Sequence, residues 1–237
     1  MSTTIIKTFI ASLLQKTFLN ISSLIVTIVL SRILTLYEFG IYSLVNTIIF
    51  FIIIFLSIGT PSSLSRYISL SNDSRYRFSL IKKSFNFLLP WIFLFSGFYL
   101  LFYFQVIDFI FGGDELKNYK LIIFFIALVE VVRLFIEKTS HGISRLGIAA
   151  EQSAYTSVLL IFLLSSSAYI YSSAESVLYA KLISLALPIP FALRKLINEF
   201  KKKIKESAPL EPSSHEIFNY GIPLTLIFLA SYGFLQI

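Results

Sequence analysis

Long apolar runs separated by short polar stretches dominate the chain. A helix that crosses the hydrocarbon core of a bilayer needs about 20 mostly apolar residues, and six runs are close to that length or longer. We therefore predict membrane-spanning helices at about 9–31, 39–60, 84–106, 119–142, 148–171 and 176–193. A seventh apolar run begins at Ile217 and extends to Ile237.

The composition agrees with a membrane protein. Hydrophobic residues make up 56% of the chain and charged residues 14%, whereas charged residues are about a quarter of an average soluble domain. The N-terminal sequence "MSTTIIKTF" lacks the short apolar core and cleavage site of a secretory signal. We expect an all-α integral membrane protein whose first span is retained as a signal anchor.

The basic residues are distributed unequally between the two ends of the predicted spans. Sixteen of the 20 lysine and arginine residues precede or enter span 1, lie within the cytoplasmic half of span 4, or occupy the loops after spans 2, 4 and 6. The other four are Arg32, Lys117, Lys120 and Lys181. Because cytoplasmic loops carry the excess of basic residues, we predict that the N-terminus and the loops after spans 2, 4 and 6 lie in the cytoplasm.

The largest polar segment is "LRKLINEFKKKIKESAPLEPSSHE", residues 193–216. Its apolar residues recur at helical spacing against a lysine face, which is typical of an amphipathic helix on an anionic membrane surface. These residues are Leu193, Leu196, Ile197, Phe200 and Ile204. The position of the lysines between two spans disfavours a nucleic-acid site, so we expect membrane lipids and no nucleic acid as partners.

A long basic linker after six spans is typical of transporters built from two bundles. We therefore predict a six-helix N-terminal lobe of a two-lobe transporter at 1–193, an amphipathic cytoplasmic linker at 194–216, and the start of a seventh transmembrane helix at 217–237. The last run has no polar flank, which indicates an N-terminal portion of a longer protein or a truncated frame. A single lobe could not open a binding site alternately to the two sides of the membrane unless two copies paired.

Motifs for catalysis are missing from the sequence. There is no cysteine, His141 and His215 are isolated, and neither a zinc-protease motif nor a phosphate-binding glycine loop occurs. We therefore expect no enzyme activity, no cofactor and no metal. Transport would be driven by an ion gradient or by the gradient of the substrate itself.

Span 4 contains the most informative charges. Glu130, Arg133 and Glu137 are spaced i, i+3 and i+7 and therefore share one helix face. In one interpretation Glu130 and Arg133 simply pair, with Glu137 near the cytoplasmic interface. In the other, Arg133 lines a cavity and binds an anionic substrate, while Glu130 holds Arg133 in position or accepts a proton.

Three other cations lie in or at the ends of spans. Lys16 and Lys181 have flexible stems that allow their amines to extend toward the cytoplasmic and the outer surface, respectively. Arg32 ends span 1 at the outer side, and Glu38 and Gly40 belong to the short hairpin that follows.

The segment "VLSRILTLYEFGIYSLVNTIIFFIIIFLSIGTPSSLSRYISL", Val29 to Leu70, resembles the N-terminal signature of the polysaccharide biosynthesis protein family. The similar elements are "SRIL" at the end of a span, "FGIY" where the next span begins, and a glycine and then "RY" after it. Also similar are "HGISRLGIAAEQ" between spans 4 and 5 and "FNYGIPLTL" at the start of span 7.

This resemblance implies two lobes around a cationic cavity and a flippase for O-antigen, capsule or exopolysaccharide repeat units. The substrate would be an undecaprenyl-diphosphate-linked oligosaccharide, and glycan-polymerisation proteins would be possible partners. Arg133 would contact the diphosphate, with Glu130 beside it and Arg32 as a second basic contact. Two alternatives stay open: an ion-coupled multidrug antiporter of the same superfamily, and a membrane scaffold of a glycan-assembly complex that does not transport.

Overall fold

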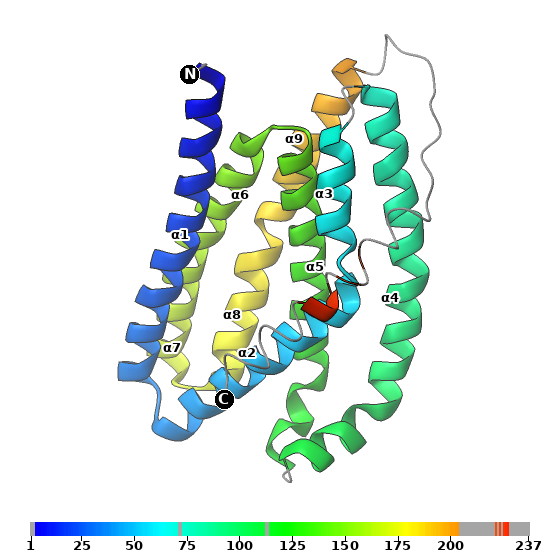
Figure 1. The fold of residues 1–237 in the computed structure, drawn as a ribbon. Coiled ribbons are helices and arrows are strands. Elements are labelled where there is room, and N and C mark those ends of the chain that lie inside the picture. The colour runs from blue at the N-terminus through cyan, green and yellow to red at the C-terminus, as the bar shows by residue number, and fades with distance from the viewer. Residues whose placement is uncertain are drawn as a thin grey trace.

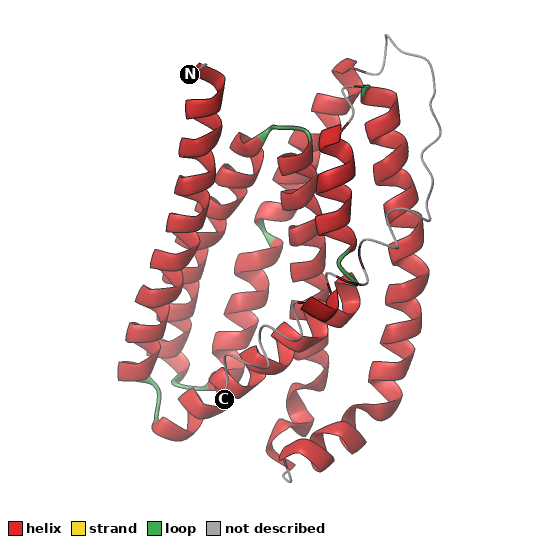
Figure 2. Cartoon of the chain, viewed as in Figure 1, coloured by secondary structure: helices red, strands yellow, loops and turns green. Residues whose placement is uncertain are grey.

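A computed structural model describes residues 3–70, 73–111, 114–203, 221, 223 and 225–227. The described part of the chain is helical and contains no strand (Figure 2). Its elements are α1 (Thr3–Ile33), α2 (Leu36–Ser57), α3 (Thr60–Leu70), α4 (Ser74–Phe111), the 3-10 helix η1 (Asp114–Tyr119), α5 (Lys120–Gly142), α6 (Leu146–Leu159), the π-helix η2 (Leu160–Leu164), α7 (Ser165–Tyr171), α8 (Ala174–Ala186) and α9 (Pro188–Lys203).

The helices form a bundle in which successive passes of the chain run in opposite directions (Figure 1). Five segments of the described chain are long and apolar enough to cross a membrane: Ser12–Ile33, Leu36–Ser57, Arg75–Tyr103, Leu146–Tyr171 and Ala174–Glu199. Helix α5 has 23 residues, but its charges make it more polar than these five. The predicted count of six spans plus a seventh is therefore not confirmed, and most of 217–237 lies outside the described residues.

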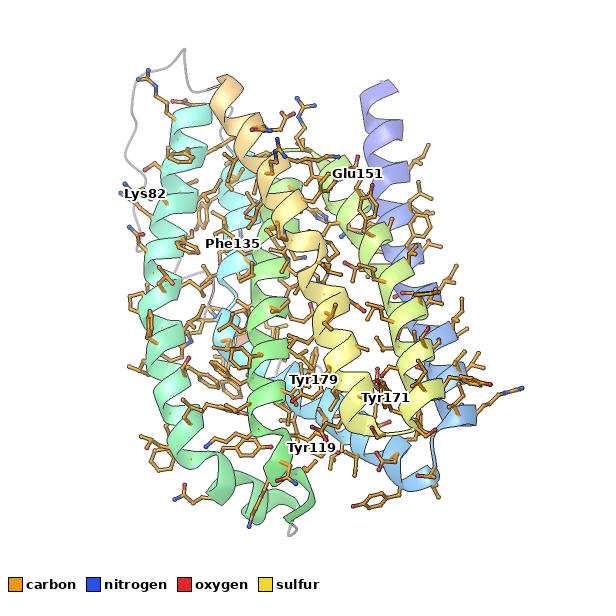
Figure 3. All side chains as sticks on the ribbon, turned by 180° about the vertical axis from the view of Figure 1, so that it is seen from behind. Lys82, Tyr119, Phe135, Glu151, Tyr171 and Tyr179 are labelled. Atoms are coloured by element: carbon orange, nitrogen blue, oxygen red, sulfur yellow. The ribbon has the colours of Figure 1, made fainter. Side chains whose placement is uncertain are left out.

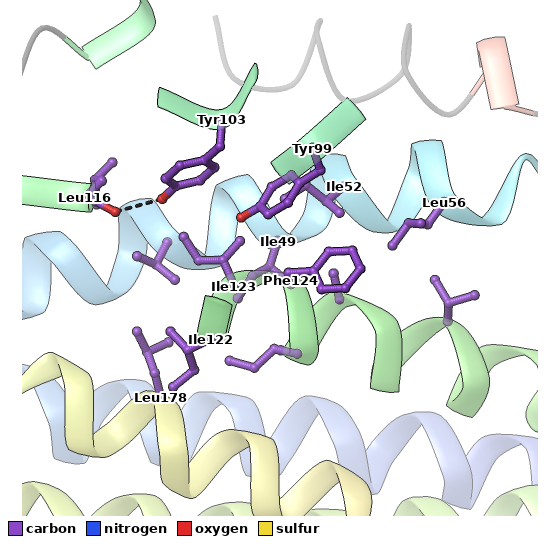
Figure 4. Packing of buried hydrophobic residues seen from close by; sticks show 14 of the residues in the cluster. Ile49, Ile52, Leu56, Tyr99, Tyr103, Leu116, Ile122, Ile123, Phe124 and Leu178 are labelled. Atoms are coloured by element: carbon purple, nitrogen blue, oxygen red, sulfur yellow. Dashed lines mark hydrogen bonds between the residues drawn. The ribbon is translucent and has the colours of Figure 1, made fainter. Parts of the chain in front are cut away.

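Helix α5 occupies the middle of the bundle and packs against α2, α3, α6, α8 and α9. In the largest buried cluster, Ile123 of α5 lies among Ile49 of α2, Leu178 of α8 and Tyr99 of α4 (Figure 4). Ile136, which follows Ile123 by 13 residues in α5, belongs to a second cluster with residues of α3, α4 and α9. Helix α5 therefore connects both ends of the bundle through buried apolar contacts.

The chain after span 2 is more helical than we predicted. Helix α3 fills part of the expected cytoplasmic loop, and α4 begins at Ser74, ten residues before the predicted start of span 3. The reason is amphipathic packing, because Leu64 and Ile68 of α3 and Leu80 of α4 are buried against Ile136. The basic residues Arg66 and Lys82 are exposed on the other faces of these helices, whereas Ser63 is buried and donates to the Gly59 carbonyl.

The predicted linker likewise begins inside a helix. Helix α9 extends from Pro188 to Lys203, following a short break after α8, and proline is favourable at the first position of a helix. Ala192 and Leu196 of α9 are buried in the second cluster, so this part of the amphipathic segment packs on protein. Residues 204–216 of the predicted linker lie outside the described residues.

The junction between α2 and α3 requires glycine. Ile58 ends α2 in a left-handed conformation with φ of 42°, and Gly59 follows with φ of 61°. A Cβ atom on Gly59 would lie 2.3 Å from the carbonyl oxygen of Gly221. The backbones of the two glycines therefore approach closely, and no side chain fits at Gly59.

We predict that Gly59→Ala destabilises the fold by at least about 1–3 kcal/mol, because a strained backbone angle and a steric clash occur together. Gly97→Ala is the matched control, since a Cβ there meets no atom within 4 Å and alanine is favourable in a helix interior. The unfolding free energy in mixed micelles measures both. Equal stability of the two variants would contradict the close approach at Gly59.

Candidate functional site

The charged face of α5 lies inside the bundle. The side chains of Glu130, Arg133 and Glu137 are only 15%, 13% and 14% exposed. Arg133 Nε donates to Glu130 Oε2 at 2.6 Å, and Arg133 Nη1 donates to Glu137 Oε2 at 3.2 Å. The three residues share one face, as their spacing predicted, and they form one ion-paired group. Glu137 is the second partner of Arg133.

Arg133 keeps donors that these carboxylates do not use. A guanidinium has five N–H groups in a planar fork, and two of them bond to Glu130 and Glu137. Neither N–H of Nη2 bonds to any other residue of the described ranges. Arg133 therefore has hydrogen-bond donors left for further oxygen atoms.

A second cation approaches this group from α8. The ammonium of Lys181 donates to Asn46 Oδ1 on α2. It also interacts electrostatically with Glu130 and Arg133. Asn46 Nδ2 in turn donates to the Tyr42 carbonyl at 2.8 Å, which holds the amide in place. The prediction that Lys181 extends to the outer surface is wrong, because its side chain turns into the bundle.

These residues balance in charge. Two cations, Arg133 and Lys181, and two carboxylates, Glu130 and Glu137, come from α5 and α8, and Asn46 adds a neutral dipole. A buried charge is costly in a low-dielectric interior unless it is paired, and here each sign has a nearby counterpart. We call these five residues the polar centre. An anionic ligand could therefore replace one of the two carboxylates as a hydrogen-bond acceptor of Arg133.

Arg32, the other predicted binding residue, lies elsewhere. It is exposed in the last turn of α1 and forms no ion pair with either carboxylate of the polar centre. Nearby, Glu38 has a role that the sequence did not reveal. Its Oε2 accepts a 2.5 Å hydrogen bond from the backbone N–H of Ala174, so it caps the start of α8.

His141 also has a partner that its isolation in the sequence concealed. Its Nε2 lies 3.0 Å from Gln15 Oε1. Gln15 is buried in α1, and His141 is in the last turn of α5. This contact joins the first helix of the chain to the helix that carries the polar centre.

Removing the two negative charges from the polar centre tests how strongly the fold depends on the pairing of Arg133 with its carboxylates. We predict that the double variant Glu130→Gln/Glu137→Gln lowers the unfolding free energy by about 3–5 kcal/mol, since it leaves a buried arginine without its counter-charges. Titration with sodium dodecyl sulfate in mixed micelles measures this loss.

The control is Glu151→Gln on α6, which is labelled in Figure 3. Glu151 pairs with Lys195, but these side chains are 49% and 39% exposed, so the expected loss is below about 1 kcal/mol. A double variant as stable as this control would show that Arg133 does not depend on its carboxylates.

The chain was compared with known proteins. The model of the family described as "Polysaccharide biosynthesis protein" matches residues 5–237. No curated protein and no solved structure matches the chain. The family match covers almost the whole chain, and it agrees with an all-helical fold that contains several apolar helices long enough to cross a membrane. The chain therefore belongs to the polysaccharide biosynthesis protein family and is a multi-pass membrane protein.

Proposed function

We propose that this protein is a flippase that moves undecaprenyl-diphosphate-linked oligosaccharides across the bacterial inner membrane for surface polysaccharide synthesis. The family includes flippases, and one observation in the structure supports this function most strongly. Arg133, inside the bundle, retains unused N–H donors beside a second cation, Lys181. A diphosphate is the part of such a substrate that needs cations in an apolar environment.

The polar centre provides a physical route for this recognition. A guanidinium forms two parallel hydrogen bonds with phosphate oxygens, and Lys181 adds a point charge from a different helix. When the diphosphate binds Arg133, it competes with Glu130 and Glu137. A carboxylate that loses Arg133 is easier to protonate, so proton uptake can accompany substrate binding.

The arrangement of charges favours an anionic substrate over the alternative antiporter function. An antiporter for cationic drugs needs a carboxylate that is available to the drug. Both carboxylates of the polar centre are bonded to Arg133, and Lys181 lies close to Glu130. A cation entering this site would have to compete with Arg133 for both carboxylates.

The proposed orientation follows from the basic residues at one end of the bundle. The start of α1, the start of α4 and the end of α9 lie at the same end (Figure 1). Arg75 and Lys82 near the start of α4 and Lys195 in α9 bring positive charge to this end. Because cytoplasmic ends of spans are enriched in lysine and arginine, we place the N-terminus in the cytoplasm.

We predict that Arg133→Gln and Lys181→Gln each lower export of surface polysaccharide about 10- to 100-fold, as expected for the loss of one charge-assisted hydrogen bond to phosphate. The measurement is the amount of polysaccharide on a bacterial strain in which the variant replaces the native chain, normalised to the amount of protein in the membrane. Accumulation of lipid-linked oligosaccharide in the inner leaflet should accompany the loss.

Arg145→Gln is the control, because Arg145 is half exposed and pairs at the surface with Glu199. Its export should equal that of the native protein. Normal export by a stable Arg133→Gln variant would contradict the flippase site. Retained binding of assembly proteins with unchanged turnover of lipid-linked glycan would instead indicate a scaffold, and expulsion of cationic dyes from energised vesicles would indicate an antiporter.

A further inference from the structure

A pocket of about 220 Å³ lies at the junction of α2 and α3, on the side where α5 passes. Phe50 and Ile53 of α2 and Leu134 of α5 form much of its apolar wall. Lys138, one turn after Leu134, also lines the pocket. The pocket therefore combines a mostly apolar lining with a single cation from a described helix, and it is separate from the polar centre.

Lys138 is half buried, and it forms no ion pair within the part of the chain that the structure describes. Its neighbour Glu137 is directed to Arg133, and no carboxylate of the described segments pairs with Lys138. A half-buried ammonium without a counter-charge is unfavourable, so this position favours the arrival of an anion. Ser62 adds a hydroxyl group to the lining that can donate to an anionic oxygen, whereas the Ser57 hydroxyl donates to the Ile54 carbonyl at 3.3 Å.

The position of the pocket along the bundle indicates the source of such an anion. Lys138 is four residues before the end of α5, or about 6 Å along a helix axis. This is the end of the bundle at which the basic start of α4 and end of α9 lie (Figure 1). Lipid phosphates occupy the interfacial layer next to the hydrocarbon core, at the depth expected for Lys138.

The size of the pocket limits the ligand. Sites for drug-sized molecules enclose about 300–1,000 Å³, and this pocket is smaller. It can accept one head group and the first part of one hydrocarbon chain, while the rest of the chain remains outside. A free inorganic phosphate would leave the wall of Phe50 and Ile53 without apolar contact.

We propose that this pocket binds the phosphate of a membrane lipid, with Lys138 contacting the phosphate oxygens and the α2 wall contacting the adjoining chain. The ligand class is an anionic phosphate ester with a single hydrocarbon chain entering the pocket. Lys138 and Leu134 lie on a different face of α5 from Arg133, so this site is distinct from the proposed transport site and can be tested independently of it.

The chain contains a native probe beside the pocket. Its single tryptophan is Trp91, whose Nε1 donates to the Phe55 carbonyl of α2 at 2.9 Å. Phe55 follows Ile54, which lines the pocket. Titration of the purified chain in dodecyl maltoside with decyl phosphate should change the Trp91 fluorescence in a saturable way and protect Lys138 from acetylation, which mass spectrometry detects.

We expect Lys138→Gln to weaken decyl phosphate binding about tenfold, as for the loss of one charge-assisted bond. Lys82→Gln, which removes an exposed lysine of α4 labelled in Figure 3, should change it less than twofold. Protection of Lys138 from acetylation reports on this pocket and not on Arg133, so failure of the transport site does not affect this test. Inorganic phosphate should bind at least tenfold more weakly than decyl phosphate.

Unchanged affinity of Lys138→Gln, or equal loss in Lys82→Gln, would overturn the proposal. Inorganic phosphate as strong a ligand as decyl phosphate would overturn the role of the apolar wall. Thermal unfolding of each variant in the same detergent checks that the fold is retained, and acetylation of Lys138 in the native chain gives a second measurement that does not depend on a substitution.

Discussion

The need to neutralise one arginine in an apolar bundle explains much of this structure. Arg133 bonds to Glu130 and Glu137 from the same helix, and this face of α5 can be buried only because other helices separate it from lipid. Helices α2, α3, α6, α8 and α9 surround α5. Large apolar side chains such as Phe93, Leu101 and Tyr169 are exposed on the outer surface instead, as expected where lipid is the solvent.

Ion pairing and substrate binding by Arg133 are compatible, although the sequence presented them as alternatives. In the absence of a ligand, the carboxylates offset the free-energy cost of burying the cation. The unused guanidinium donors are available to an anion before either carboxylate leaves. Lys181 and Asn46 extend the same arrangement across α8 and α2. A site of this kind is electrically balanced while it is empty. When a diphosphate enters, the site gains negative charge, and protonation of a carboxylate can offset it.

The sequence predicts the local features of the fold well because apolar runs and i, i+3, i+7 spacing are properties of single helices. The pairing of Glu130 with Arg133 was one of the two interpretations that their spacing allowed, and the family was inferred from the resemblance of short motifs along the chain. Contacts between distant segments could not be predicted in this way. Lys181 meets Asn46 from 135 residues away, and Glu38 caps α8 from 136 residues away. The helical course of α3 and the start of α4 depended on burial of Leu64 and Leu80 against α5.

The central claim is that Arg133 is shared between its carboxylates and an anionic substrate. The most direct test is the affinity of the purified chain for a polyprenyl diphosphate, compared between the native protein and Glu137→Gln by tryptophan fluorescence or calorimetry. If a carboxylate and the diphosphate compete for the guanidinium, Glu137→Gln should bind the diphosphate about tenfold more tightly, corresponding to roughly 1.4 kcal/mol. Unchanged or weaker binding in a folded Glu137→Gln variant would contradict the claim.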